Sequence, residues 1–305
     1  MRSRLLFYFV LLSGYNCPFM KRIIEPGTLS TKDLHQYIIG SIAPRPIAFV
    51  STLDENGVAN LAPYSFFNAF SSNPPILVFS SNRRVSDNTT KDTLHNVRVS
   101  GECVINVVPY AILRQMSLAS VEFPREISEF TKTGLTPEAS VHVKAPRVAE
   151  SPVNMECIVT DIIELGQHGG AGHLIICEVK LIAISEDVFT NQKLDPNKLD
   201  LMGRLGRNYY VRASGSALME IYQSVTESPL GYDGLPEFIV NSPILTGNEI
   251  ATLASLTSLP TPQEVQELQA HFPEIADYTD RDKHVKASEW LKEGRVREAL
   301  TIIVA

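Results

Sequence analysis

The sequence lacks the features that mark several large functional classes. It has 4 cysteines among 305 residues, and none of them forms a C-x-x-C pair, so neither a disulfide-rich secreted fold nor a thiolate zinc site is expected. Basic side chains do not predominate: 27 Lys and Arg face 34 Asp and Glu, for a net charge of −7. This balance argues against a protein that binds a nucleic-acid backbone. Cysteines within apolar runs favour a reduced, cytoplasmic setting.

Several catalytic motifs are also missing. The sequence contains no phosphate-binding G-x-x-x-x-G-K-[ST] loop and no G-x-S-x-G nucleophile elbow. The glycines at 169–172 and 203–206 do not follow a strand and open a helix, so a Rossmann domain is not expected. His168 and His173 lie five residues apart around three glycines and cannot share a helical face, so no metal site is predicted.

The first nineteen residues need a separate interpretation. MRSR followed by LLFYFVLL resembles the charged and apolar parts of a signal peptide. No small-x-small cleavage site follows, and eight apolar residues are too few to span a bilayer. We therefore expect 1–19 to be an upstream extension, with translation starting at Met20, and we expect no membrane association.

Charge divides the rest of the chain into two parts. Residues 214–305 carry 14 acidic and 6 basic side chains, whereas residues 1–213 carry 20 and 21. A nearly neutral body over 20–213 and an acidic extension over 214–305 are predicted, consistent with one or two domains for this length.

The body has the pattern of a mainly β fold. Strands are predicted at 46–52, 58–62, 65–70, 76–81, 103–108, 141–148, 153–165 and 173–185, with Asn56-Gly57 closing the first hairpin. Short helices are predicted within 86–97 and 113–119. Strands joined by turns rather than by crossover helices favour an antiparallel barrel.

The extension has helical periodicity instead. Helices are predicted at 247–259, 262–272, 282–292 and 296–303. Thr261, Pro262 and Glu264 form a helix start in which the cap, the first-turn proline and the capping-box acid are all present.

Polar side chains gather at three predicted strand ends between residues 40 and 96. They belong to the runs GSIAPRPIAFVST, NLAPYSFFN and SSNR, followed by KDT-x-x-N. Hydroxyl, amide and cationic groups of this kind suit a planar ligand with a polyol and a phosphate. The same residues could instead close turns, cap a helix or be solvated.

Together these four blocks, in this order and spacing, resemble the flavin reductase-like, FMN-binding split-barrel family. The resemblance covers about 21–213 and includes Gly172-His173 and the run RLGRNYY at 204–210. It implies a six-stranded antiparallel split barrel, a homodimer and bound FMN.

The resemblance also implies site residues, carried over by position. The FMN contacts are expected from Arg45, Val50, Ser51, Thr52, Asn60, Ala62, Ser65, Ser80, Ser81, Asn82, Arg83, Lys91 and Thr93. Of these, 80–83, Lys91 and Thr93 are expected around the phosphate. His173 is the catalytic candidate, on the side of the flavin where nicotinamide or acceptor binds, although a strand-end histidine bonded to backbone is an equal alternative.

Two functions follow from the resemblance. The first is an NAD(P)H-dependent flavin reductase, with NADH or NADPH as donor, that supplies an oxygenase partner. The second is a non-enzymatic flavin-binding electron carrier that serves a protein redox partner through the acidic extension. Many dedicated reductases carry Gly-Asp-His where this chain has Ala171-Gly172-His173, which weakens the first reading.

Overall fold

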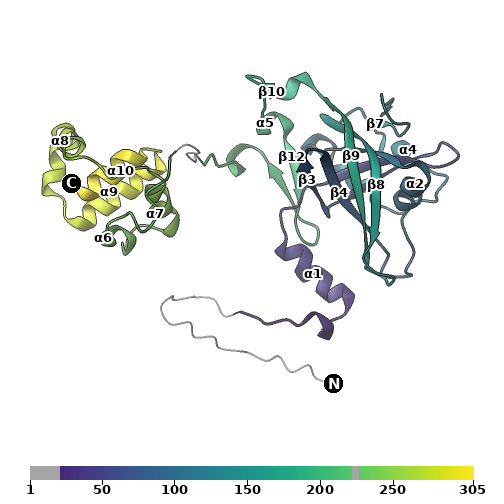
Figure 1. The fold of residues 1–305 in the computed structure, drawn as a ribbon, viewed down its shortest axis with the longest axis horizontal. Coiled ribbons are helices and arrows are strands. Elements are labelled where there is room, and N and C mark those ends of the chain that lie inside the picture. Colours follow the sequence, from purple (N-terminus) through teal and green to yellow (C-terminus); the bar gives the residue numbers. More distant parts are fainter. Residues whose placement is uncertain (1–20, 222–226) are drawn as a thin grey trace. The chain divides into compact units, whose positions relative to one another are not determined.

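The computed structural model describes residues 21–221 and 227–305. These residues form two compact units, and the chain passes from one to the other between Leu218 and Met219, close to the expected boundary at 213. The first unit is built on β-sheet and the second on helices (Figure 1).

A seven-stranded sheet forms the first unit, in the order β2-β1-β5-β8-β9-β4-β3. Every neighbouring pair is antiparallel. Its strands are β1 (Ala48–Leu53), β2 (Ala59–Tyr64), β3 (Phe67–Ser72), β4 (Pro75–Asn82), β5 (Glu102–Asn106), β8 (Val153–Glu164) and β9 (Gly172–Ile184). The described residues thus give seven strands where the resemblance implied six.

The sheet curls because its two outermost strands are consecutive in the chain. Only Ser65 and Phe66 separate the end of β2 from the start of β3, although these strands occupy opposite ends of the strand order. The sheet must therefore bend until its edges approach, and β2 comes into contact with β4. The Ser80 N–H donates to the Phe66 carbonyl at 2.8 Å across this corner. The result is an open barrel.

Side chains alternate between the inside and the outside of this barrel, as the two-residue period of a strand requires. Val50, Tyr64, Phe79, Ile105 and Ile175 belong to one buried cluster on the inner face. The cysteines of β5, β8 and β9 join this cluster as free thiols, where they act as small apolar side chains.

Short helices and hairpins surround the barrel. The helices are α1 (Thr31–Ser41), α2 (Asp92–Ser100), α3 (Leu113–Leu118), α4 (Glu129–Thr133) and α5 (Pro196–Leu199). The short strand pairs are β6 (Pro137–Glu138) with β7 (Arg147–Val148), β10 (Phe189–Thr190) with β11 (Lys193–Leu194), and β12 (Leu201–Arg204) with β13 (Tyr210–Ala213). Helix α2 packs Leu94 and Val97 against the inner cluster.

One expectation about local structure was wrong, and another is confirmed with a late start. The strand expected at 141–148 survives only as Arg147–Val148, because the backbone N–H groups of Val141 and His142 donate to the buried Glu156 carboxylate. The short helix expected within 86–97 is α2, which begins at Asp92, because Asp87 accepts hydrogen bonds from both the N–H and the hydroxyl of Thr89. In both segments a side-chain acceptor takes backbone donors that a strand or helix would otherwise use.

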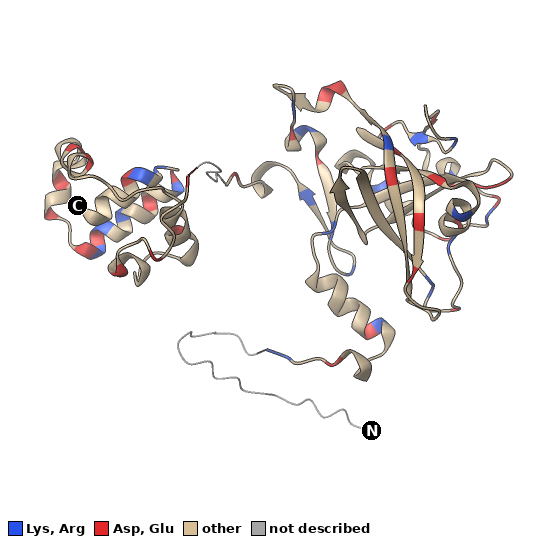
Figure 2. Ribbon diagram, viewed as in Figure 1, with Lys and Arg blue, Asp and Glu red and all other residues tan. Residues whose placement is uncertain are grey.

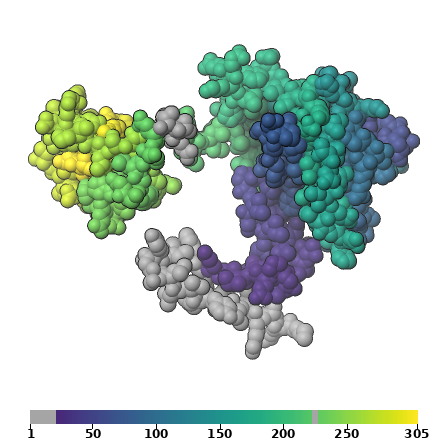
Figure 3. Space-filling view, in the orientation of Figure 1, coloured from purple at the N-terminus to yellow at the C-terminus, as the bar shows by residue number. Residues whose placement is uncertain are grey.

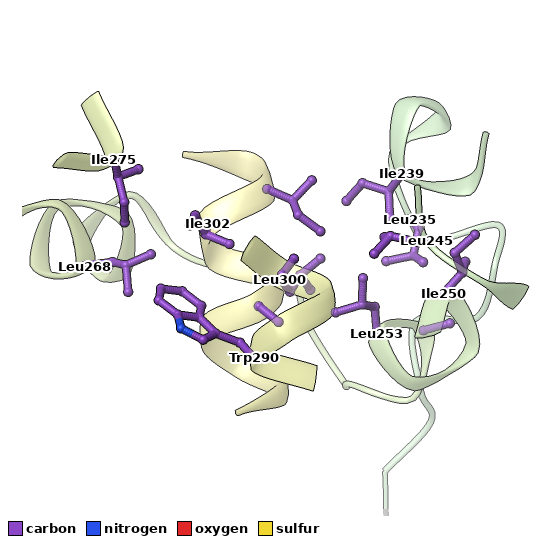
Figure 4. Close-up of a cluster of buried hydrophobic side chains, with 14 residues drawn as sticks. Leu235, Ile239, Leu245, Ile250, Leu253, Leu268, Ile275, Trp290, Leu300 and Ile302 are labelled. Atoms are coloured by element: carbon purple, nitrogen blue, oxygen red, sulfur yellow. The ribbon is translucent and has the colours of Figure 1, made fainter. Parts of the chain in front are cut away.

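The second unit is a small helical body with its own core (Figure 4). It contains α6 (Glu237–Val240), α7 (Gly247–Ala254), α8 (Pro262–His271), α9 (Asp280–Lys292) and α10 (Val296–Val304). Trp290, Leu253, Leu300 and Ile302 are buried in its core. The capping box expected at Thr261 is confirmed, and Thr246 and Thr279 begin α7 and α9 in the same way. The four predicted helices are therefore present, with small shifts at their ends.

The acidic excess of this unit is spread over its helices rather than gathered on one of them. Figure 2 shows basic and acidic residues interspersed along them, and Arg297 pairs with Glu264 at 2.8 Å. Figure 3 shows the unit in space-filling form, coloured from green to yellow.

Candidate functional site

The inner face of β2 and the start of α2 form one side of a pocket, which we call pocket 1. Asn60, Ala62 and Tyr64 reach it from alternate positions of β2, and Lys91, Asp92 and Thr93 reach it from the start of α2. Pro63, Arg84, residues 119–123 and Glu129 complete the lining. Its volume is about 120 Å³, which is smaller than a typical ligand pocket. It therefore suits one polar part of a larger molecule.

Two cations stand together in pocket 1. The Lys91 ammonium lies 4.9 Å from the centre of the Tyr64 ring. Burial, and then the neighbouring Arg84 charge, lower the pKa of Lys91. The Arg84 guanidinium is held by the Thr89 hydroxyl at 2.9 Å and the Thr90 carbonyl at 2.8 Å. An anion bound between the two cations would relieve their repulsion.

A carboxylate forms another part of the lining. Glu129, at the start of α4, is 7% exposed. It accepts hydrogen bonds from the Asn60 amide at 3.1 Å and from the Leu61 N–H at 2.8 Å. Burial raises the pKa of Glu129. Asn60 in turn accepts from the Thr93 hydroxyl at 2.7 Å, so β2, α2 and α4 are joined through one amide.

Several buried polar atoms of the first unit have no hydrogen-bond partner among the described residues. They include Tyr64 Oη, which belongs to a residue of pocket 1, and Ser81 Oγ, Asn96 Oδ1 and His173 Nε2, which do not. Burial raises the pKa of Tyr64 to about 12, although the nearby Thr93 and Ser81 hydroxyls oppose this effect. Unpaired buried polar atoms are costly and call for a ligand or water. The two cations of pocket 1, together with its Asn60, Thr93 and Glu129 side chains, fit a phosphorylated polyol.

A second pocket lies on the outer face of β3, β4 and β9, and we call it pocket 2. Its volume is about 390 Å³, and its walls are mostly apolar, with Phe66, Phe67, Phe70 and Leu174 among them. Tyr64 lines pocket 1 and Phe66 lines pocket 2, so the two pockets lie on either side of the same chain corner.

The structure divides the predicted site residues. Asn60, Ala62, Lys91 and Thr93 come together in pocket 1, whereas Ser80 and Asn82 line pocket 2. The alternation of β4 is the reason, since Ser81 shares the inner face with Phe79 while its two neighbours point outward. The residues predicted around the phosphate are thus divided between two faces of the sheet.

Other predicted residues line neither pocket and have structural bonds instead. Arg45 donates from Nη1 to the carbonyls of Ile39 and Ile42, both at 2.5 Å, and so anchors α1. Its Nε donates to the Ser65 hydroxyl at 3.4 Å. Burial, and then the Arg204 charge, lower the pKa of Arg45.

The predicted residues of β1 are buried in the barrel wall. Val50 and Ser51 have no exposed surface. The Ser51 hydroxyl donates to the Pro146 carbonyl at 2.5 Å, on the outer side. Thr52 is also buried, and its hydroxyl accepts from the Asn96 amide at 3.0 Å.

Arg83 and His173 meet at a carboxylate near the end of β8. Arg83 pairs with Glu164 at 3.4 Å, and His173 Nε2 lies 3.8 Å from the same carboxylate. His173 has no exposed surface, and its Nδ1 donates to the Ser81 carbonyl at 2.9 Å. This is the geometry of the alternative given for His173, a strand-end histidine bonded to backbone.

Sequence reasoning missed Arg84, Glu122 and Glu129. Arg84 adjoins the predicted Arg83, but it lies beyond the end of β4 at Asn82, so the alternation of the strand does not single it out. Glu129 reaches Asn60 across 69 residues of sequence, and no local pattern signals that contact.

The described residues show neither a metal cluster nor a membrane-spanning helix. Within 21–221 and 227–305, no group of three or more His, Cys, Asp or Glu side chains is placed to hold a metal ion. No helix in the same residues is long and apolar enough to cross a membrane.

Comparison with known proteins decides the family. The sequence pattern of the flavin reductase like domain matches residues 40–199. The chain belongs to the flavin reductase-like family. The match includes every predicted site residue, and the helical unit lies outside it.

Relatives and solved structures agree with this assignment. An uncharacterised protein of Aquifex aeolicus is 40% identical over 190 residues, which are 62% of this chain and 94% of that protein. The crystal structure of nitrilotriacetate monooxygenase component B from Bacillus cereus is 30% identical, with a TM-score of 0.61 over 67% of this chain and 98% of that one. The 2-nitrobenzoate 2-nitroreductase of Pseudomonas fluorescens is 27% identical, with a TM-score of 0.58 over 66% and 96%. This flavin reductase-like chain therefore has a mainly β, split-barrel-like fold with short helices.

Proposed function

We propose that this protein is an FMN-binding flavoprotein that acts as an NAD(P)H-dependent flavin reductase. The observation that carries the proposal is pocket 1, where Arg84 and Lys91 meet beside the network of Glu129, Asn60 and Thr93. A phosphorylated polyol such as the side chain of FMN presents an anion and hydroxyl groups to such a site. Membership of the flavin reductase-like family supports the choice of ligand.

Each part of the site has a role in this proposal. Arg84 and Lys91 would hold the phosphate by charge. The polyol would lie beside Asn60, and the volume of about 120 Å³ leaves the ring system outside pocket 1. The bound flavin would supply the redox chemistry by accepting a hydride from NADH or NADPH. The chain's own residues bind and orient the ligand and, through the buried inner face of the barrel, exclude water from one side of it.

A second candidate function is a non-enzymatic electron carrier that serves a protein redox partner. The buried position of His173 favours it, because this side chain reaches neither pocket to contact a nicotinamide. The helical unit, with its acidic excess, would attract a basic partner.

We also propose a homodimer and an oxygenase partner. Strand β3 is an edge strand, and Phe70 on it is 68% exposed beside apolar pocket 2. An exposed apolar edge of this kind is a natural surface for a second copy. The Bacillus cereus relative is by name one component of a monooxygenase, which supports a separate oxygenase as the consumer of reduced flavin.

One experiment tests the function and separates the two candidates. The purified protein, loaded with FMN, is mixed anaerobically with NADH or NADPH in a stopped-flow instrument while flavin absorbance is followed. Rapid bleaching with either donor is expected for a reductase. Bleaching by neither donor, with fast reduction by a reduced redox protein, would establish the carrier instead, and a protein that binds no FMN would contradict both.

A further inference from the structure

Glu129 has hydrogen-bonding capacity that the protein does not use. A carboxylate offers about four lone-pair sites. Asn60 contacts both oxygens, and Leu61 contacts Oε2, so Oε1 retains an acceptor site. Glu129 lines pocket 1, and no Lys or Arg is paired with it among the ion pairs of the described residues. This remaining site is suited to a hydroxyl donor.

The same carboxylate determines the hydrogen-bonding role of Thr93. Because an ionised carboxylate only accepts, the Asn60 amide must direct its NH₂ group toward Glu129 and its oxygen toward Thr93. The Thr93 hydroxyl hydrogen is therefore used in the bond to Asn60. What Thr93 can offer a ligand is an oxygen lone pair.

Pocket 1 is consequently divided by hydrogen-bonding character. Arg84 and Lys91 supply only donors, whereas Glu129 and Thr93 supply acceptors. A phosphate suits the first pair and is repelled by the second. Hydroxyl groups next to a phosphate satisfy both.

We propose that Glu129 is a specificity-determining residue that, with Thr93, accepts hydrogen bonds from the hydroxyl groups of the ligand's polyol chain. The inference rests on the proposed function, because it assigns the polyol of a phosphorylated flavin to this side of pocket 1. Glu129 thereby selects for a polyol-bearing flavin, and Arg84 and Lys91 select for its phosphate. The ligand group assigned to Thr93 changes accordingly, from the phosphate to the polyol.

Three flavins with successively fewer groups test the assignment. FMN has the polyol and the phosphate, riboflavin lacks the phosphate, and lumiflavin lacks both. Their dissociation constants are measured by fluorescence titration for the full chain and for Glu129→Gln. The matched control is Glu126→Gln, an exposed glutamate three positions earlier that does not line pocket 1.

We expect Glu129→Gln to weaken FMN and riboflavin binding about tenfold or more, as for the loss of a hydrogen bond to a charged group. Lumiflavin affinity should not change, and Glu126→Gln should leave all three constants unaltered. Thr93→Val, which keeps the side-chain shape, should produce the same pattern with a smaller loss. This second variant replaces the first if Glu129→Gln lowers the melting temperature enough to impair folding.

The outcomes separate this inference from the proposed function. Equal weakening of all three flavins, or no change in any of them, would overturn the role of Glu129 and leave FMN binding intact. A loss confined to FMN would overturn it as well, because Glu129 would then act on the phosphate. A wild-type chain that binds none of the three would overturn the proposed function and this inference with it.

Discussion

The Glu122 carboxylate pairs with the Arg84 guanidinium at 2.9 Å in the lining of pocket 1. The protein thus places its own anion beside the two cations that we assign to the ligand's phosphate. Glu122 is 68% exposed, so the pair is easily broken, and a bound phosphate would compete with it.

Replacing Glu122 should therefore strengthen anion binding. We expect Glu122→Gln to lower the dissociation constant for FMN about two- to fivefold, the scale of an exposed ion pair. Riboflavin, which has no phosphate, should bind the variant and the wild type equally. Titrations at low and high salt check the cause, since the gain in FMN affinity should shrink as salt screens the charges. An equal gain in riboflavin affinity would contradict an effect on the phosphate.

The lowered pKa of Lys91 predicts a pH limit for phosphate binding. Because burial and Arg84 lower this pKa, Lys91 loses its charge at a lower pH than the usual value near 10.5. As the pH rises, FMN affinity should therefore begin to fall before pH 10.5 is reached, whereas riboflavin affinity should stay constant. Lys91→Arg keeps its charge and should move the fall to higher pH, whereas an unchanged profile in that variant would assign the titration to another group.

The helical unit should lose stability in mild acid through His284. Its Nδ1 accepts the Ser242 hydroxyl at 2.6 Å, and burial lowers its pKa. A histidine whose pKa is lower in the folded state contributes its full stability above the unfolded-state pKa of about 6.5. That contribution is lost as the pH falls from this value through the folded-state pKa. Trp290 is the single tryptophan and lies in this core.

Tryptophan fluorescence therefore measures this loss directly. Urea midpoints followed at Trp290 should fall between pH 7.5 and pH 5. His284→Asn, which lacks the titrating ring, should show a smaller fall over the same interval. An equal fall in both proteins would attribute the acid sensitivity to the carboxylates of the unit instead.

The proposed homodimer makes Phe70 a residue of the contact surface. Phe70→Glu places a charge on the exposed apolar edge of β3 and should convert the dimer to a monomer in sedimentation velocity. Val99→Glu, also at an exposed position, at the end of α2, is the control and should remain dimeric. Dimers in both variants would locate the interface elsewhere.

Much of the local structure could be predicted from the sequence. The Asn56-Gly57 turn is confirmed, with Gly57 at φ 81° and the Asp54 N–H bonded to the Val58 carbonyl. The start of α8 at Thr261 is likewise confirmed. These features depend on residues a few positions apart, whose hydrogen bonds form whatever the rest of the chain does.

The site was less predictable because it depends on which face of each strand is turned inward. The motif around 80–83 identified the right strand, but the alternation of β4 placed Ser81 inside and its neighbours on the outer surface. Beyond the strand, Arg84 rather than Arg83 joins Lys91 in pocket 1.

The sequence by itself determined the family, most strands of the sheet and the four long helices of the second unit. Only the tertiary structure decided which side chains form pocket 1. Glu129 reaches Asn60 from 69 residues away, and Glu122 reaches Arg84 from another loop. Such contacts arise from the curling of the sheet and the packing of α4 against β2, and no short-range pattern in the chain encodes them.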